Sequence, residues 1–219
     1  MKESSPKRRY HSPRRQAQAA STRQKLLESA ERLFVTQGYG ATTLAAIARV
    51  AGVSLPTVTA IFGTKLAILN ALIDTTVRGD EMPIPLSERD WWTAALDERD
   101  PVRLLERYAA NIRRIHERTT DIFEIVRGAA TVDPEIAAIR RELAGGRLGD
   151  SRGIVNALAE RGVLKPGVLA ERATDLLWAL VSAEFYRMLV VEREWSPEEY
   201  EHWLAATLLD AFVSRTEDA

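Results

Sequence analysis

The stretch from Thr42 to Lys65 constrains the fold of this chain more than any other part of its sequence. Its residues, TTLAAIARVAGVSLPTVTAIFGTK, predict two short helices separated by a turn at Gly52, where glycine adopts a left-handed backbone without steric cost. Ser54 is a good N-cap for the second helix, and Pro56 removes a first-turn amide that would have no intrahelical partner. Such a pair fits a DNA major groove, although the same shape also occurs in helical proteins that bind no DNA.

The helical period assigns a face to each side chain of this pair. Leu44, Ile47 and Ala48 share one face of the first helix, and Val58 and Ile61 point inward from the second. The residues expected to face outward are Ser54, Leu55, Thr57 and Thr59.

The order A-G-V-S-x-x-T-x-x-x-x-F-x-x-K, found from Ala51 to Lys65, resembles the DNA-binding domain of the tetracycline-repressor (TetR) family of transcriptional regulators. The preceding GYGATT (Gly38–Thr43) and the helix expected over Lys65–Val77 match the layout of that family. The resemblance therefore covers residues 22–77.

This resemblance implies an all-α fold in two parts. Residues 20–80 would form an N-terminal three-helix helix-turn-helix DNA-binding domain, with the helix-turn-helix at 43–62. Residues 81–219 would form a larger helical ligand-binding and dimerisation domain. The DNA-binding residues that we expect are Arg23, Thr42, Thr43, Leu44, Ser54, Leu55, Thr57, Thr59 and Lys65.

Two of these residues carry specific expectations. The family usually has an aromatic residue, most often tyrosine, at the position of Thr59, where the ring packs on the phosphate backbone; threonine covers less surface, so affinity or target preference would differ. Lys65 follows the expected N-cap Thr64 in the first turn of a helix, where free amides and the helix dipole already favour an anion. We therefore expect Lys65 to clamp a phosphate.

Charge is distributed unevenly along a chain whose net charge is only −1. Residues 1–65 hold eleven Lys and Arg against three Glu, a net charge of +8, so the remainder carries −9. Such asymmetry favours one end built for a polyanion. Residues 1–19 are polar and basic without an apolar period, and we expect a disordered arm that follows DNA or merely aids solubility.

The composition predicts a cytoplasmic protein, associated with the nucleoid when bound to DNA. The chain has no cysteine, its N-terminus has no apolar segment after its charges, and no apolar run reaches membrane-spanning length. We expect no cofactor and no membrane association.

Helix signals recur along the whole chain, and no alternating stretch is long enough for a strand. The first helix should run from Thr22 to Gln37 and end at Gly38, and residues 79–87 should form a linker. Gly145, Gly146 and Gly149 are expected in a polar break. Start signals are predicted at Ser87 with Asp90, Asp100–Pro101, Asp133–Pro134 and Ser196 with Glu199.

Two helices near the C-terminus suggest a subunit interface. The segment Asp175–Val191 is apolar nearly all round, so it must be buried on every side, and Pro197–Phe212 carries its own apolar stripe. Paired with a twofold copy they would form a four-helix bundle, and TetR-like proteins dimerise through their last two long helices. We expect a homodimer through residues 173–192 and 197–213, the alternative being one large monomeric core.

Chemistry typical of an enzyme is absent from the sequence. The three histidines lack metal-ligand spacing, and neither a phosphate-binding glycine loop nor a G-x-S-x-G elbow occurs. The C-terminal part instead combines aromatic residues with polar residues on apolar helices, which favours an apolar cavity with a few polar anchors. TetR-like proteins carry their effector in this domain. The expected ligand-binding residues are Tyr108, Asn111, His116, Phe123 and Trp178.

The sequence thus predicts a homodimeric repressor that binds a pseudo-palindromic DNA operator and is released by a small apolar or aromatic ligand. A DNA-binding regulator that needs no ligand is the first alternative. A helical enzyme or scaffold that carries a DNA-binding domain is the second.

Overall fold

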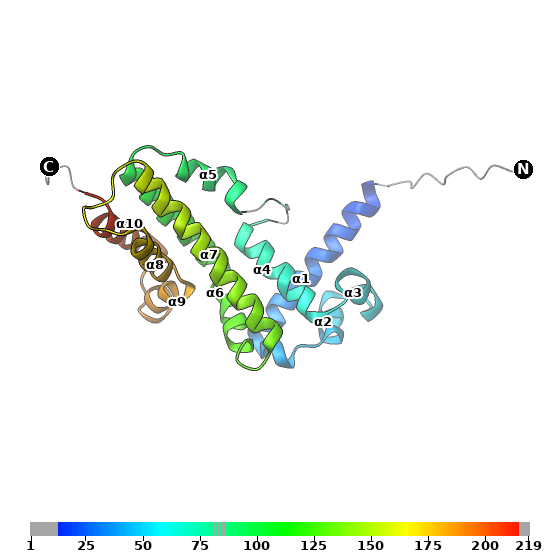
Figure 1. Ribbon diagram of the computed structural model, residues 1–219. Coiled ribbons are helices and arrows are strands. Elements are labelled where there is room, and N and C mark those ends of the chain that lie inside the picture. Colours follow the sequence, from blue (N-terminus) through cyan, green and yellow to red (C-terminus); the bar gives the residue numbers. More distant parts are fainter. Residues whose placement is uncertain (1–12, 81, 83, 85, 215–219) are drawn as a thin grey trace, which may run out of the picture. The chain divides into compact units, whose positions relative to one another are not determined.

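The computed structural model describes residues 13–80, 82, 84 and 86–214, and every regular element among them is a helix (Figure 1). This confirms the predicted all-α class. The α-helices are α1 (Pro13–Ala41), α2 (Leu44–Ala51), α3 (Leu55–Phe62), α4 (Lys65–Arg78), α5 (Asp90–Leu96), α6 (Pro101–Ala129), α7 (Pro134–Glu160), α8 (Ala170–Leu180), α9 (Ala183–Tyr186) and α10 (Pro197–Phe212). A 3-10 helix, η1 (Leu86–Glu88), precedes α5, and a π-helix, η2 (Arg187–Glu192), follows α9.

The chain divides into two compact units, one ending at Leu72 and one beginning at Ile73, so α4 belongs to both. In the first unit α1 buries Leu26, Leu27, Ala30 and Phe34, which form the expected apolar stripe. These side chains leave the polar face of α1 to solvent.

Helix α1 begins earlier than the sequence predicted. Residues 13–19 of the expected arm are helical, and residues 1–12 lie outside the described part of the chain. Without an apolar period the segment gave no helix signal, although its alanines and glutamines have high helix propensity. Gly38, with φ of 81°, interrupts the helix where the sequence placed its end.

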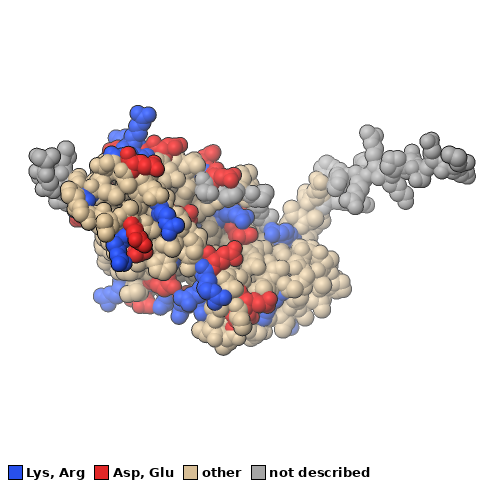
Figure 2. Space-filling model, viewed as in Figure 1, with Lys and Arg blue, Asp and Glu red and all other residues tan. Residues whose placement is uncertain are grey.

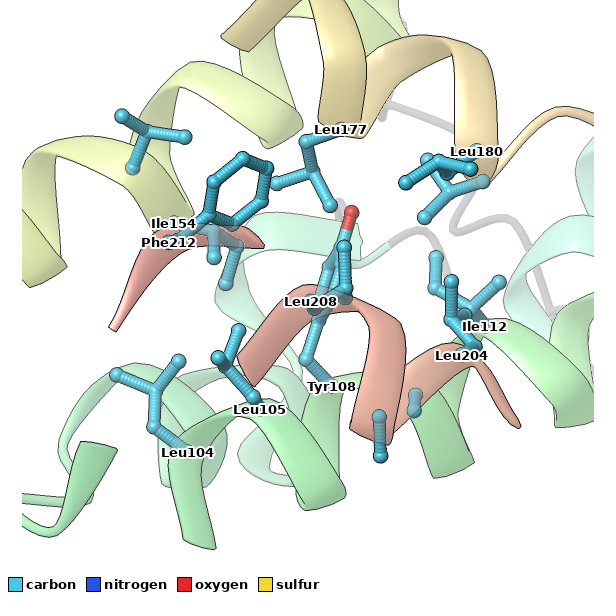
Figure 3. Packing of buried hydrophobic residues seen from close by; sticks show 14 of the residues in the cluster. Leu104, Leu105, Tyr108, Ile112, Ile154, Leu177, Leu180, Leu204, Leu208 and Phe212 are labelled. Carbon is cyan, nitrogen blue, oxygen red and sulfur yellow. The ribbon is translucent and has the colours of Figure 1, made fainter. Parts of the chain in front are cut away.

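The second unit is built around α6, with α10 packed along it and α8 packed along α7. Their inward faces form one apolar core (Figure 3). Its fully buried members include Leu104, Leu105, Ile154, Leu177, Leu204, Leu208 and Phe212.

Side-chain caps fix where these helices begin. Asp100 accepts from the amide of Val102, Asp133 accepts from the amide of Glu135, and Ser196 with Glu199 forms the predicted capping box. The cap expected at Ser87 with Asp90 is wrong, because α5 starts after Arg89 without a side-chain cap. Arg89 instead forms a bidentate pair with Asp80 at 2.7 and 2.8 Å, which bridges the predicted linker.

Two expectations about helix continuity are corrected. The apolar segment Asp175–Val191 is not one helix: it breaks after Leu180, because Ser182 caps α9 by accepting from the amide of Phe185. In contrast, Gly145, Gly146 and Gly149 lie inside the continuous helix α7. Packing of α7 on α8 and α6 outweighs the low helix propensity of glycine, which costs about 1 kcal/mol per residue.

Candidate DNA-binding surface and ligand cavity

Helices α2 and α3 form the predicted helix-turn-helix. Their axes are bent by 110° at the break, and Gly52 makes the turn with φ of 69°. Thr43 caps α2 by accepting from the amide of Ala46 at 3.1 Å, and Ser54 caps α3 by accepting from the amide of Thr57 at 3.3 Å. The turn and the Ser54 cap agree with the sequence prediction, and the pair is held by local bonds that its own sequence supplies.

One face of α3 is exposed within this unit. We call it the α3 face. It consists of two pairs of residues, each one helical turn apart: Leu55 with Thr59, and Pro56 with Ala60. Helix α3 has no charged residue, and the surface over it shows neither charge colour in Figure 2, whereas the second unit shows both signs side by side. The α3 face therefore presents methyl and other apolar groups to a binding partner, and no charged side chain.

The remaining predicted residues of this helix occupy varied positions. Ser54 is exposed, whereas Thr57 is half-buried with its hydroxyl 2.8 Å from the Ser54 hydroxyl. The Thr59 hydroxyl donates to the carbonyl of Leu55 at 3.2 Å. Ile61 is 36% exposed and not inward, because it lies about 60° of helical rotation from the buried Val58, at the edge of the stripe.

The residues expected before α3 are only partly available to a ligand. Thr42 is buried and donates to the carbonyl of Gly38 at 2.8 Å, so little of its side chain is available, and its role as a DNA contact stays a prediction. Thr43 is exposed but serves as the cap of α2, and Leu44 is half-buried. The guanidinium carbon of Arg23 lies 5.3 Å from the centre of the Phe62 ring, at the end of α3.

Lys65 has a structural environment that the sequence did not predict. Its ammonium donates to the carbonyls of Tyr39 at 2.6 Å and Thr42 at 2.9 Å, and it lies 4.1 Å from the centre of the Tyr39 ring. These carbonyls belong to the last turn of α1 and the segment after it. The ammonium thus joins α4 to the end of α1, and its expected role as a phosphate clamp stays a prediction.

The second unit contains a cavity of about 590 Å³ between α6, α7, α8 and α9. Its wall is mainly apolar and includes Phe123, Val126, Ala144, Trp178, Phe185 and Met188. Charged residues also line it: Glu124, Arg127, Arg140, Arg141, Arg147 and Glu184. A largely apolar pocket of this size with a few polar groups is typical of a small-molecule site.

The five predicted ligand-binding residues divide between this cavity and the core. Phe123 and Trp178 line the cavity, and the indole nitrogen of Trp178 donates to the carbonyl of Ala144 at 3.0 Å. Tyr108, Asn111 and His116 do not line it, so a role for them in ligand binding stays a prediction. Their polar atoms face the closed interior of the helix packing, which sequence periodicity cannot distinguish from a cavity wall.

Each of these three residues has a different environment. Asn111 donates to the carbonyl of Trp91 at 3.0 Å, and Tyr108 is buried among the core leucines (Figure 3). His116 lies against Tyr186, and its Nε2 donates at 3.1 Å to the carbonyl of Val181, which the break after α8 leaves accessible. Burial lowers the pKa of His116 to about 4, so the ring is neutral near neutral pH.

Sequence reasoning missed the arginines of the cavity. Arg140 and Arg147 are two helical turns apart on α7, a spacing that would have placed them on one face. An arginine on a polar helix usually lies in solvent, so nothing local marked them as cavity residues.

Two further features of the described residues bear on function. No cluster of three or more His, Cys, Asp or Glu side chains suited to a metal ion occurs among them. No single helix in this part of the chain is long and apolar enough to span a membrane, and only the bent pair α2–α3 meets that test jointly.

Both units of the chain are similar to known proteins. The family described as "Bacterial regulatory proteins, tetR family" matches residues 26–72. The regulator TtgR of Pseudomonas putida is 29% identical over 184 residues, which cover 81% of this chain and 85% of TtgR. The transcriptional repressor BepR of Brucella suis biovar 1 is 28% identical over 174 residues, 77% of this chain and 80% of BepR.

A solved structure shows the same fold over most of the chain. The complex of SmeT with triclosan superposes with a TM-score of 0.70 at 19% identity, covering 90% of this chain and 93% of SmeT. The likeness therefore extends beyond the helix-turn-helix to the helices that enclose the cavity.

Proposed function

The chain is a transcriptional regulator of the tetR family, and we propose that it is a homodimeric repressor released from its operator by a small organic ligand. The observation that carries this proposal is the capped helix-turn-helix with an exposed, uncharged α3 face. Such a helix can enter a major groove without desolvating charges of its own.

The α3 face suggests how the operator is read. Leu55 and Ala60 offer apolar contacts that suit thymine methyl groups, and Ser54 and Thr59 offer hydroxyls. Because Thr59 stands where an aromatic ring is usual in this family, phosphate contacts would come from other groups, including the basic residues 1–19. We infer half-sites with thymine beneath α3, spaced by about one helical turn or a small multiple.

We propose dimerisation through the segments 173–192 and 197–213, and exposed apolar side chains support it for the first of the two. Leu176 on α8 is 45% exposed and Val191 on η2 is 53% exposed in the single chain. A second copy would cover them and give the apolar segment its expected second partner. The two α3 helices would then read the two halves of a pseudo-palindrome.

The ligand would occupy the cavity of the second unit. Phe123, Trp178, Phe185 and Met188 provide an apolar wall for an apolar or aromatic body, and the fold is shared with SmeT, which was solved with triclosan. We propose no catalytic role and no cofactor. A cytoplasmic location, on the nucleoid when DNA is bound, follows from that function.

A charge-reversal experiment tests the DNA-binding surface. Leu55→Glu places a carboxylate on the α3 face, where repulsion from phosphates should weaken operator binding by about 100-fold or more. The assay is fluorescence anisotropy with DNA from upstream of the chain's own gene. Val35→Glu on α1, a residue of similar exposure, is the matched control and should bind within about 2-fold of the original protein.

Three results would contradict the proposal. The first is equal binding by the Leu55→Glu and Val35→Glu proteins. The second is a footprint without twofold symmetry, and the third is a protein that sediments as a monomer when it is bound to its operator.

A further inference from the structure

The charged side chains of the cavity do not balance. Four arginines and two glutamates line it, an excess of two positive charges. Both glutamates are already paired: Glu124 with Arg127 at 2.6 Å and with Arg187 at 3.3 Å, and Glu184 with Arg140 at 3.5 Å. Among the residues that the structure describes, Arg141 and Arg147 have no ion pair. Arg141 is exposed, whereas Arg147 is half-buried.

Arg147 is held against the aromatic wall of the cavity. Its guanidinium carbon lies 5.1 Å from the centre of the Trp178 ring, and its Nε is buried without a hydrogen-bond partner in the described part of the chain. Burial lowers the pKa of Arg147, although Glu184 opposes this effect. A guanidinium that is partly withdrawn from water and unpaired is costly unless an anion or acceptor completes it.

Further buried polar atoms lie in the interior of this unit. The side chains of Tyr108 and Ser151 interact with each other, whereas Tyr200 Oη and His116 Nδ1 are buried and have no hydrogen-bond partner among the described residues. Ser151 lies one helical turn after Arg147, and Figure 3 shows the Tyr108 hydroxyl directed into the interior between Leu177 and Leu180. Buried polar atoms without a partner are rare in native proteins, so Arg147 Nε, Tyr200 Oη and His116 Nδ1 mark a part of the interior that is not fully satisfied.

Electrostatics links these atoms to Arg147. Burial has the largest effect on the pKa of each ring, raising those of Tyr108 and Tyr200 and lowering that of His116. The charge of Arg147 lowers the pKa of all three residues. The guanidinium therefore lines the cavity and is close enough to these buried groups for its charge to act on them.

We propose that the cavity binds an aromatic carboxylate, with the carboxylate on Arg147 and the ring against Trp178 and Phe123. This rests on the proposed ligand-responsive function and assigns the chemical class of the ligand. The two terminal nitrogens of Arg147 donate to the two carboxylate oxygens, a paired geometry that a guanidinium favours. Arg147 is thus the residue that selects an anion over an uncharged compound of the same shape.

The test compares two probes that share one ring system. 2-Naphthoate is an anion near neutral pH, and 2-naphthamide has nearly the same shape without charge. Calorimetric titration of the full chain, without DNA, should show naphthoate binding roughly 10- to 100-fold more tightly, the range expected for hydrogen bonds to a charged group.

Substitutions assign that preference to Arg147. Arg147→Gln should remove most of the preference by weakening naphthoate and leaving naphthamide within about 2-fold, and Arg147→Lys should keep part of it because the charge remains. Arg152→Gln removes an exposed arginine of α7 that does not line the cavity, and it should keep the preference within about 2-fold. Circular dichroism melting of each variant shows whether it is folded.

The outcomes separate this proposal from the proposed function. Equal affinity for the two probes, no binding of either, or an unchanged preference in folded Arg147→Gln protein would overturn the anion assignment. Naphthoate binding that depends on Arg147 but leaves operator affinity unchanged would support the anion site and contradict ligand-controlled release.

Discussion

The buried His116 ring predicts a specific dependence of stability on pH. Burial lowers its pKa in the folded chain to about 4, whereas an unfolded histidine titrates near 6.5. The unfolded chain therefore binds this proton more readily. The stabilisation is fully present above about pH 6.5 and is lost as the pH falls toward 4.

The size of the effect follows from the two pKa values. A difference of one between the folded and unfolded pKa values corresponds to about 1.36 kcal/mol, so protonation of His116 in both states removes about 3.4 kcal/mol of stability. Between about pH 7.5 and 4.5 the expected loss is about 2.5 kcal/mol, because protonation of the folded form begins near the lower end. Other acidic groups add to the total slope, so the contribution of His116 must be measured as a difference.

The assay is urea unfolding of the original protein and of His116→Gln at one protein concentration and several pH values. Glutamine does not titrate, and its amide can still donate to the carbonyl of Val181. The variant should lose about 2.5 kcal/mol less than the original protein over this pH range. His202→Gln, the same substitution at an exposed position, is the control. Parallel pH profiles for His116→Gln and the original protein would refute the reasoning.

Two further predictions concern the ends of α4. Lys65→Met should lower the free energy of unfolding by about 1.5–3 kcal/mol, measured by thermal melting with Lys25→Met as the control. If Lys65 were a phosphate clamp, the substitution would instead reduce the salt slope of DNA binding by about 1. Arg118 donates to the carbonyls of Thr76 at 3.0 Å and Val77 at 3.2 Å. Arg118→Gln should reduce the effect of ligand on operator affinity by about 0.5–2 kcal/mol without changing ligand affinity. Arg114→Gln should leave the effect of ligand unchanged, and equal effects in both variants would exclude a role of Arg118 in coupling.

Local signals in the sequence predicted most of the fold. Ser54, Asp100, Asp133 and Ser196 each accept a bond from an amide within three residues, so the information for these helix starts lies in a few adjacent positions. The break at Ser182 uses the same chemistry. The sequence did not reveal it, because the apolar pattern on either side is typical of one continuous helix.

The sites depend on distant partners, which one sequence does not reveal. Lys65 bonds to the carbonyl of Tyr39, 26 residues earlier, and no periodicity predicts that pairing. Trp178 and Phe123 could be predicted because large aromatic residues on apolar helices often line a cavity. Arg147 was not predicted because the contact that distinguishes it is with the ring of Trp178. That residue follows it by 31 positions in the chain.

Helix α6 joins the features that a ligand-controlled switch needs. Its C-terminal part lines the cavity through Phe123. His116, two turns earlier, holds the carbonyl freed by the α8–α9 break, and Arg118 holds the end of α4. A ligand changes operator affinity only if it binds one arrangement of these elements more tightly than another.

We expect two such arrangements to differ at the break after α8, because side chains and not helix bonds hold the backbone there. Ser182 lines the cavity and also caps α9, and the neighbouring Val181 carbonyl is held by a side chain and not by a helix. A ligand between Trp178 and Phe123 would contact both sides of this break and the end of α6. A shift of α6 would then reach α4 through Arg118, and α4 is continuous with the unit that carries α3.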